Sequence, residues 1–198
     1  MREPLNTPRD IARELARKYS TMTHDELDVL ESILVPMKFG KNEMILKEGE
    51  VCENIYYIDR GVIRQFYFKN GKEVTEHLGS DRSIFMCIES LFLEIPTLLQ
   101  VETIEPSVIY ALPKHRLEQV ALHNVNIQIL YRKILEESLI ISQVHADLVR
   151  FETAQDRYKK MCKLSPQVIL RVPLVYIASY LQMTPETLSR VRAATLLE

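Results

Sequence analysis

The chain has 198 residues, of which 46% are hydrophobic and 26% charged, and its formal net charge is −2 at pH 7. This balance is typical of a globular protein and argues against a disordered chain. No apolar run approaches the roughly 18 residues that span a bilayer, and residues 1–20 hold no apolar signal segment. The three cysteines are too few and too scattered for a disulfide framework, a zinc site or a four-thiolate cluster. We therefore expect a cytoplasmic protein with no metal, no cofactor and no membrane partner.

The charges are distributed unevenly along the chain. Between Arg157 and Arg192 there are seven basic residues and a single acidic one, Glu186, whereas residues 1–156 hold 18 basic and 25 acidic residues. A basic C-terminal segment on an acidic body favours a polyanionic partner. Chance clustering of charge on a solvated face is the alternative.

Residues 8–35 are predicted to be helical, because apolar residues recur there at spacings of three and four. Thr23 followed by Glu26 has the spacing of a capping box, which marks the start of a second helix. Pro36 is expected to end the helical pattern.

From Met37 to about Leu112, short runs of β-branched and aromatic residues alternate with turn signals. Asn70-Gly71 stands between two such runs and predicts a type I′ hairpin, since both central residues of that turn need a positive φ. Many short strands at nearly regular spacing predict a barrel, a sandwich or a roll.

A long helix is predicted from Ile127 onward, over about 25 residues and thus about 37 Å. Its apolar residues alternate at spacings of three and four, which predicts a coiled-coil seam between two subunits. The predicted seam residues are Ile127, Leu130, Ile134, Glu137, Ile141, Val144, Leu148 and Phe151. A helix packed on its own β domain is the alternative.

Near the C-terminus, two short helical patterns are joined by Gln182-Met183-Thr184. Apolar residues fall at the positions that would fix the angle between two helices: Ile177, Ala178, Leu181, Met183, Leu188 and Val191. Thr184 is a good N-cap and Pro185 follows it at a position that tolerates proline. The pattern indicates a helix-turn-helix unit, although Gln182 stands where glycine is usual. An ordinary helical hairpin is the alternative.

The remaining residues of this unit are expected to face DNA. Arginine can bind guanine with two hydrogen bonds, a carboxylate can accept one from cytosine N4, and hydroxyl groups can contact phosphates. The candidate DNA-binding residues are Tyr176, Thr184, Pro185, Glu186, Thr187, Ser189, Arg190 and Arg192.

The segment DRYKKMCKLSPQVILRVPLVYIASYLQMTPETLSRVR, residues 156–192, resembles the C-terminal domain of the CRP/FNR family of bacterial transcription regulators. The order of parts agrees over nearly the whole chain. The resemblance implies an α+β fold with three parts. A cyclic-nucleotide-binding-like β-roll (a jelly-roll-like double-stranded β-helix) with flanking helices would cover residues 1–125. A dimerisation helix would cover 126–151, and an all-α helix-turn-helix domain 152–198.

The family's recognition helix often carries Glu and then Ser-Arg three positions on, which here are Glu186, Ser189 and Arg190. The resemblance assigns Glu186 and Arg190 to base contacts, and Ser189 to a base or a phosphate. The pattern is similar to that of the FNR branch, whose half-sites read like TTGA. Only AATLLE follows Arg192, so we expect a member without the family's winged hairpin.

The effector site departs from the family's cyclic-nucleotide cassette, which reads Phe-Gly-Glu-Leu, a short helix, and Arg-Ser/Thr-Ala. Cys87 and Ile88 stand where Gly-Glu is expected, and Leu98 and Leu99 where Arg-Ser is expected. Without the arginine a buried phosphate would be strongly disfavoured, so we expect no binding of cAMP. The candidate pocket residues for an unidentified apolar effector are Phe85, Met86, Cys87, Ile88, Leu98 and Leu99. The alternative is that they simply fill the roll.

These observations predict a homodimeric, sequence-specific transcription regulator that is not an enzyme. Its expected partners are a palindromic operator in double-stranded DNA, a second copy of the chain, RNA polymerase and an unidentified small-molecule effector. A cupin-like metalloenzyme would need converging histidines, whereas the five histidines here are scattered. An effector-sensing or protein-interaction module that has lost DNA binding is the remaining alternative.

Overall fold

Two short helices come first in the computed structural model, which describes residues 6–195. They are α1 (Pro8–Tyr19) and α2 (His24–Ile33). The Thr23–Glu26 capping box is confirmed: the Thr23 side chain accepts from the Glu26 N–H, and the Glu26 carboxylate accepts from the Thr23 N–H. The helical stretch ends earlier than predicted, because Pro36 lies inside the first strand.

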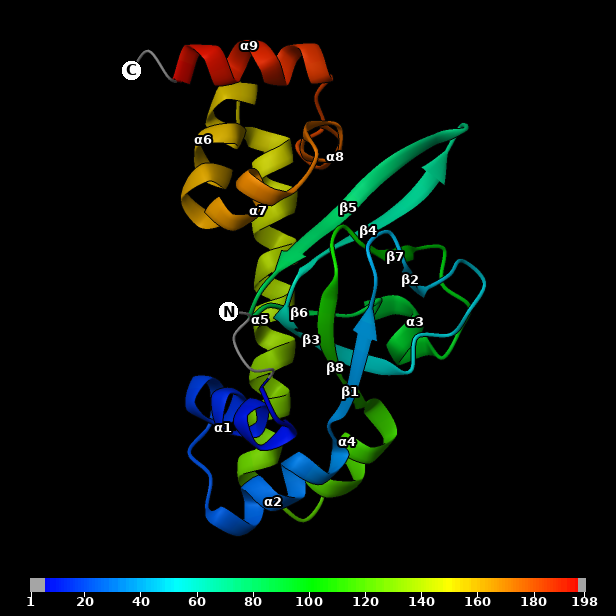
Figure 1. Cartoon of the computed structure of the whole chain (residues 1–198), viewed down its shortest axis with the longest axis vertical. Helices are drawn as coiled ribbons and strands as arrows, with labels where there is room; N and C mark the ends of the chain where they lie inside the picture. The colour runs from blue at the N-terminus through cyan, green and yellow to red at the C-terminus, as the bar shows by residue number, and fades with distance from the viewer. Residues whose placement is uncertain (1–5, 196–198) are drawn as a thin grey trace.

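Eight short strands follow and form two antiparallel sheets. They are β1 (Val35–Phe39), β2 (Met44–Leu46), β3 (Asn54–Arg60), β4 (Val62–Lys69), β5 (Lys72–Ser80), β6 (Ile84–Phe85), β7 (Gln100–Thr103) and β8 (Ser107–Pro113). The strand orders are β1-β8-β3-β6 and β2-β7-β4-β5. A short helix, α3 (Ile88–Leu93), lies between β6 and β7. The predicted α+β fold with a β-roll is therefore confirmed (Figure 1).

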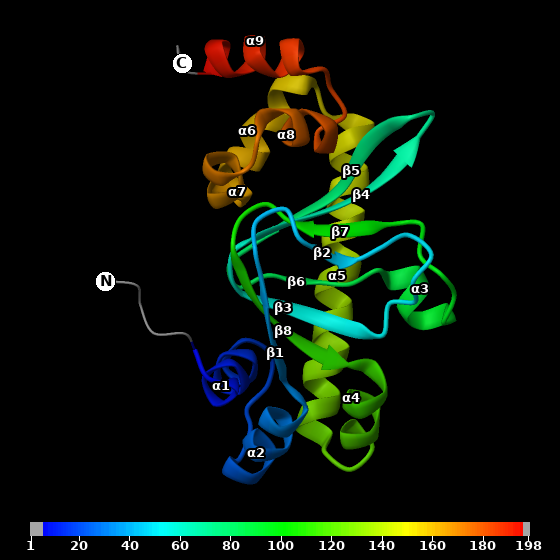
Figure 2. The ribbon, with the colours of Figure 1, turned by 45° about the vertical axis from the view of Figure 1, so that its right-hand side comes forward.

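The hairpin at Asn70-Gly71 joins β4 to β5 as predicted. Lys69 pairs with Lys72, and the two turn residues have φ values of 53° and 74°. Both values are positive, as a type I′ turn requires. The hairpin extends beyond the rest of the roll toward the C-terminal helices (Figures 1 and 2). It therefore lies where those helices can pack against it.

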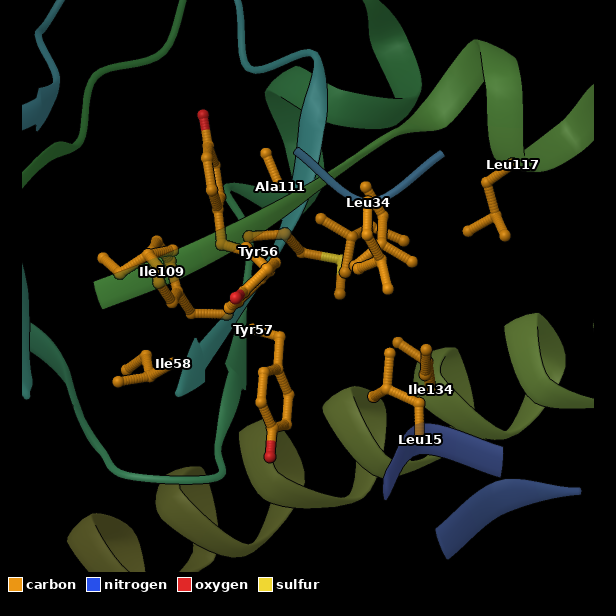
Figure 3. Close-up of a cluster of buried hydrophobic side chains, with 14 of the residues drawn as sticks. Leu15, Leu34, Tyr56, Tyr57, Ile58, Ile109, Ala111, Leu117 and Ile134 are labelled. Carbon is orange, nitrogen blue, oxygen red and sulfur yellow. The ribbon is translucent and has the colours of Figure 1, made fainter. Parts of the chain in front are cut away.

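A hydrophobic core joins the inside of the roll to the helices around it. Figure 3 shows Leu15 of α1 and Ile134 of α5 on the side of β3 toward which the Tyr57 ring points. All three side chains are at most 1% exposed. Burial of large apolar side chains contributes about 1.5–3 kcal/mol each, so the N-terminal helices, α5 and the roll fold as one body.

The helices α4 (Lys114–Ala121) and α5 (Val125–Phe151) come next. The predicted long helix is present: α5 has 27 residues and passes the N-terminal helices, the roll and the C-terminal helices (Figure 2). It therefore connects every part of the molecule.

The predicted subunit seam on α5 needs correction. Ile127, Leu130 and Ile134 are at most 1% exposed and belong to the core of their own roll, and Leu148 is buried among the C-terminal helices. Glu137 accepts hydrogen bonds from Lys18 Nζ (2.8 Å) and the Tyr19 hydroxyl (2.6 Å), both in α1. These side chains are already packed or hydrogen-bonded within their own chain, so they are not available for a subunit seam. A heptad pattern predicts a buried apolar stripe but does not determine which element covers it.

Four helices complete the described chain: α6 (Ala154–Leu164), α7 (Pro166–Arg171), α8 (Leu174–Tyr180) and α9 (Pro185–Thr195). Figure 1 shows α9 at the end of the molecule farthest from α2. Every helix within residues 6–195 is too short or too polar to traverse a lipid bilayer.

Candidate nucleic-acid interface and effector pocket

The helices α8 and α9 form a tightly packed pair. Ile177, Leu181 and Leu188 have no exposed surface and Ala178 is 1% exposed, as their predicted inward positions require. The Met183 N–H donates to the Ala178 carbonyl at 2.9 Å, which closes the connection between the two helices. Gln182 takes the predicted positive φ, at 50°. The angle between the helices is therefore fixed by burial and by the turn.

The start of α9 is capped as predicted. The Thr184 hydroxyl accepts a hydrogen bond from the Thr187 N–H at 3.1 Å, and Pro185 is the first helical residue. Hydrogen bonds from its own N–H and from Thr184 hold the pKa of the Glu186 carboxyl below its usual value. The exposed end of α9 thus presents a charged carboxylate, which can accept a hydrogen bond from a base amino group.

One face of α9 carries three exposed polar side chains. Glu186, Ser189 and Arg190 are all exposed, and their spacing of three and four places them on the same side of the helix. Arg190 Nη2 donates to Thr187 Oγ1 at 3.3 Å, while its remaining donors stay available. An acceptor, a hydroxyl and a guanidinium therefore share a single helical face.

Two of the predicted DNA-binding residues, Tyr176 and Arg192, are partly buried within the chain. The guanidinium of Arg64 in β4 lies over the Tyr176 ring, 3.7 Å from its centroid. The ring of Tyr176 therefore packs against the roll, while the expected contact of its hydroxyl with a phosphate stays a prediction. Arg192 is half-buried, and its role in DNA binding stays a prediction.

The α8–α9 pair is docked on the outer face of the roll. Val62, Leu78 and Ile104 of the roll share an apolar cluster with the C-terminal helices. The Thr75 N–H in β5 donates to the Ser179 hydroxyl at 2.9 Å. Because α8 contacts both sheet residues and α5, the orientation of α9 depends on the roll.

A stacked pair of rings joins α5 to α8. His145 and Tyr180 have ring centroids 4.2 Å apart and an interplanar angle of 7°. The His145 Nε2 also lies 3.1 Å from the Tyr180 carbonyl oxygen. The C-terminal end of α8 is therefore tied to the long helix as well as to the roll.

A second ionic contact joins the C-terminal helices to the roll. Arg171 at the end of α7 donates to Asp81 at 2.7 Å and also pairs with Glu105. Burial opposes the charge on Asp81, but hydrogen bonds from Arg171 and the Gly61 N–H hold the pKa of its carboxyl below its usual value. Arg171 contributes to the basic segment in sequence, yet its charge is matched by two carboxylates of the roll.

A cavity of about 530 Å³ lies between the roll, α5 and the connection of α8 to α9. Four of the six predicted effector residues line it: Phe85, Met86, Ile88 and Leu99. The other two do not, because Cys87 is buried at 3% exposure behind the wall and Leu98 is 74% exposed. The cavity thus brings together four of the predicted residues, and the prediction was wrong for Cys87 and Leu98.

The cavity is more polar than an apolar effector would need. Its further lining residues include Gln65, Glu76, His77, Glu89, His145 and Arg150. Burial, and to a smaller extent electrostatic repulsion from His145, lowers the pKa of His77 to about 4, so the His77 ring is neutral near pH 7. The sequence predicts an apolar pocket, whereas the lining of the cavity is partly polar. The difference arises because strand residues far from the cassette and residues of α5 complete the wall.

No group of three or more His, Cys, Asp or Glu side chains within residues 6–195 is placed to hold a metal ion. The expected absence of a winged hairpin concerns the segment after Arg192. This segment ends with residues 196–198, which lie outside the described residues.

Residues 36–124 match the family model of the cyclic nucleotide-binding domain. Among curated proteins, none matches the sequence significantly.

The fold is shared with solved structures of bacterial proteins. FixK2 from Bradyrhizobium japonicum superposes with a TM-score of 0.70 at 20% identity, over 82% of this chain and 84% of FixK2. The catabolite activator protein of Thermus thermophilus gives 0.55 at 21% identity, over 91% and 85%. A mutant of CooA from Carboxydothermus hydrogenoformans gives 0.62 at 15%, over 82% and 76%. The chain therefore has a cyclic nucleotide-binding domain at residues 36–124 and, overall, the fold of FixK2 and of the Thermus thermophilus catabolite activator protein.

Proposed function

We propose that the protein is a homodimeric, sequence-specific DNA-binding transcription regulator. The observation that carries this proposal is the shared exposed face of Glu186, Ser189 and Arg190 at the start of α9. The first residues of a recognition helix meet base edges in the major groove. Arg190 would bind a guanine, Glu186 a cytosine amino group, and Ser189 a base or a phosphate. Thr184, Thr187 and Ser189 hydroxyls would contact the backbone and hold the register.

A second copy of the chain is the proposed partner of α5. Leu139, Ile140, Ile141 and Val144 are 41–69% exposed and lie within six consecutive residues of this helix. Apolar stretches of this kind on a long helix mark association surfaces. Of the residues predicted for the seam, Ile141, Val144 and Phe151 remain exposed and available for this role. A dimer would present two α9 helices to successive major grooves, about 34 Å apart.

The cavity is proposed to hold an effector other than cAMP. A cyclic phosphate is best held by an arginine fork, and leucines occupy the cassette positions where the family places that group. The arginine that does line the cavity, Arg150, shares it with two carboxylates, Glu76 and Glu89. A doubly acidic wall disfavours an anion. Since the cavity touches α5, an effector there could shift the balance between two arrangements of α9.

The proposal is tested by selecting bound sequences from a random duplex pool with the wild-type protein and Arg190→Ala. Wild type should enrich a palindrome, and the variant should lose or relax one base in each half-site. Arg82→Ala is the matched control, because Arg82 is an exposed arginine of the roll whose side chain is 77% accessible. Enrichment of the same palindrome by wild type and Arg190→Ala would refute the assigned base contact.

The second candidate is a protein-interaction module without DNA reading. Leu164, Leu170, Leu174 and Val175 of the C-terminal helices are 42–78% exposed, which favours a protein partner for these helices. In a DNA-binding regulator the same helices would suit RNA polymerase. Failure of the dimeric wild type to enrich any sequence at low salt would place this candidate first.

A further inference from the structure

Exposed apolar side chains gather around α3 at the edge of the roll. Five of them, here called the α3 patch, are between 37% and 74% exposed: Val51, Phe92, Leu93, Ile95 and Leu98. All five lie in two short segments, residues 47–53 and 88–98. Scattered apolar residues are ordinary on a protein surface, whereas several that lie together and are rimmed by polar groups mark an interaction site.

Backbone contacts join the two segments into one surface. Val51 pairs with Pro96 in an isolated antiparallel bridge. Beside this bridge, the Thr97 N–H donates to the Glu50 carbonyl oxygen and the Gly49 N–H donates to the Thr97 carbonyl oxygen, both at 2.8 Å. The loop before β3 and the loop after α3 are therefore fixed side by side.

The helix α3 is attached to both loops through one buried hydroxyl. Ser90 is 2% exposed, and its hydroxyl accepts from the Cys52 N–H at 2.8 Å and donates to the Ile95 carbonyl oxygen at 2.6 Å. The α3 patch is thus held in place by hydrogen bonds within the chain before any partner binds. A surface that is already ordered loses less conformational entropy on binding.

The rim of the α3 patch is acidic. Residues 47–53 and 88–98 hold a single basic residue, Lys47, and five glutamates, all exposed: Glu48, Glu50, Glu53, Glu89 and Glu94. One positive and five negative side chains give these segments a net charge of −4. The ammonium group of Lys114, at the start of α4, pairs with Glu94 at 3.1 Å and offsets only one of these charges. Such a rim attracts a basic partner and repels nucleic acid and anionic lipid.

The patch is separate from the surfaces that the proposed regulator would use. Figures 1 and 2 both show α3 at a distance from the C-terminal helices and from the middle of α5. A second copy bound along α5, or DNA bound at α9, would therefore leave the α3 patch free for another partner.

We propose that the α3 patch docks a basic amphipathic helix of a partner protein. The apolar face of that helix would lie on Phe92, Leu93 and Leu98, and its lysines or arginines would meet the surrounding glutamates. Apolar contact would provide most of the affinity, and the charges would select and orient the partner. The proposal does not depend on DNA binding.

The test uses the full chain and a fluorescein-labelled peptide of about 18 leucine and lysine residues patterned as an amphipathic helix, a length sufficient for a helix. A second peptide carries glutamate in place of lysine. Fluorescence anisotropy should show saturable binding of the lysine peptide that weakens with added salt, and little binding of the glutamate peptide. Equal affinity for the two peptides, or no binding of the lysine peptide, would overturn the proposal.

Hydrogen exchange then locates the bound lysine peptide. Residues 47–53 and 88–98 should be protected. Protection confined to α5 or to the C-terminal helices, which also carry exposed leucines, would overturn the proposal. Protection of residues 88–98 that grows with protein concentration in the absence of peptide would identify a second copy of the chain as the occupant instead. Protection of the same residues by phosphatidylcholine vesicles but not by the peptide would identify a lipid surface.

A pair of leucine substitutions tests the apolar contact. Leu93→Ser combined with Leu98→Ser should weaken binding of the lysine peptide by about tenfold or more, because both side chains lose apolar contact with the peptide. Leu122→Ser is the control, since it removes an 80% exposed leucine that lies outside the patch, and it should leave the affinity unchanged. Unchanged affinity in the double variant would contradict docking on the patch.

A pair of charge substitutions separates the acidic rim from general attraction. Glu48→Gln combined with Glu53→Gln should weaken the lysine peptide, whereas Asp25→Asn combined with Glu136→Gln should not. The control removes the same charge from exposed positions on α2 and α5. Equal weakening in the two double variants would show that the peptide responds only to net charge. Circular dichroism verifies that each variant is folded.

Discussion

The guanidinium carbon of Arg64 in β4 lies 3.7 Å from the centroid of the Tyr176 ring in α8. Arg64 is only 2% exposed, and its Nη2 pairs with Glu73 and Glu102, each at 2.8 Å. The Phe66 ring covers the other side, with its centroid 3.9 Å away. A buried arginine held between two rings and two carboxylates fixes the first helix of the α8–α9 pair against the roll.

Replacing Arg64 by methionine is expected to lower the free energy of unfolding by roughly 2–3 kcal/mol, because Glu102 would keep a largely buried charge without a partner. Urea denaturation measures the change. Arg82→Met is the control, since Arg82 forms an exposed ion pair with Glu14 and such pairs contribute about 0–1 kcal/mol. A variant as stable as wild type would contradict this account, because removing the arginine alone leaves the buried Glu102 carboxylate without its partner.

The Arg171–Asp81 pair predicts a pH dependence. The folded-state pKa of Asp81 lies below its ordinary value of 3.8, so its contribution is fully present above pH 3.8 and is lost as the pH falls through the folded pKa. Removing the guanidinium in Arg171→Gln should therefore flatten the acid limb of stability below about pH 4. Urea midpoints across this pH range measure the slope.

The matched control for this slope is Arg132→Gln, which removes an exposed arginine from an i,i+4 pair with Glu136 on α5. It should leave the acid limb as in wild type. If the acid limb of the stability curve is unchanged in Arg171→Gln, Arg171 does not lower the folded-state pKa of Asp81.

Features set by neighbouring residues could be predicted from the sequence. The Thr23–Glu26 box, the Asn70-Gly71 hairpin and the Thr184 cap each depend on a few adjacent positions, and each is present. The inward residues of the α8–α9 pair were also predictable, because helical periodicity alone determines which side of a short helix is apolar.

Features that depend on distant contacts could not be predicted. The stripe from Ile127 to Leu148 was assigned to a partner subunit, yet most of it packs on the roll and the C-terminal helices. No residue near Arg64 in the sequence predicts that the Tyr176 ring covers the Arg64 guanidinium. Leu98 was placed in the cavity by its position in the cassette, whereas the turn after α3 leaves it 74% exposed.

The turn between α8 and α9 predicts a stabilising substitution. Gln182 has a φ of 50°, a left-handed conformation that costs roughly 1–2 kcal/mol for a residue with a side chain. Gln182→Gly should raise the free energy of unfolding by about 0.5–1 kcal/mol after the entropy cost of glycine. Gln119→Gly, in the interior of α4, should lower it by about 1 kcal/mol. Changes of equal sign in the two variants would contradict this reading of the turn.

The exposed centre of α5 predicts the position of the subunit interface. Ile140 is 61% exposed and lies in the apolar stretch proposed to contact a second copy. Ile140→Glu should convert the dimer to folded monomers, because a charge would be buried near its symmetry mate and desolvated without a partner. Sedimentation velocity measures the mass, and circular dichroism the retention of the fold.

Two further glutamate substitutions separate association from folding. Leu122→Glu, at an 80% exposed leucine just after α4, should leave both the dimer and the fold unchanged. Ile134→Glu, at a 1% exposed position on the same helix as Ile140, should unfold the chain, since its side chain is part of the roll's own core. If Ile140→Glu stays dimeric, the interface lies elsewhere and α5 serves only its own subunit. If Ile134→Glu gives a folded monomer, this result would support the subunit seam that the heptad pattern predicts.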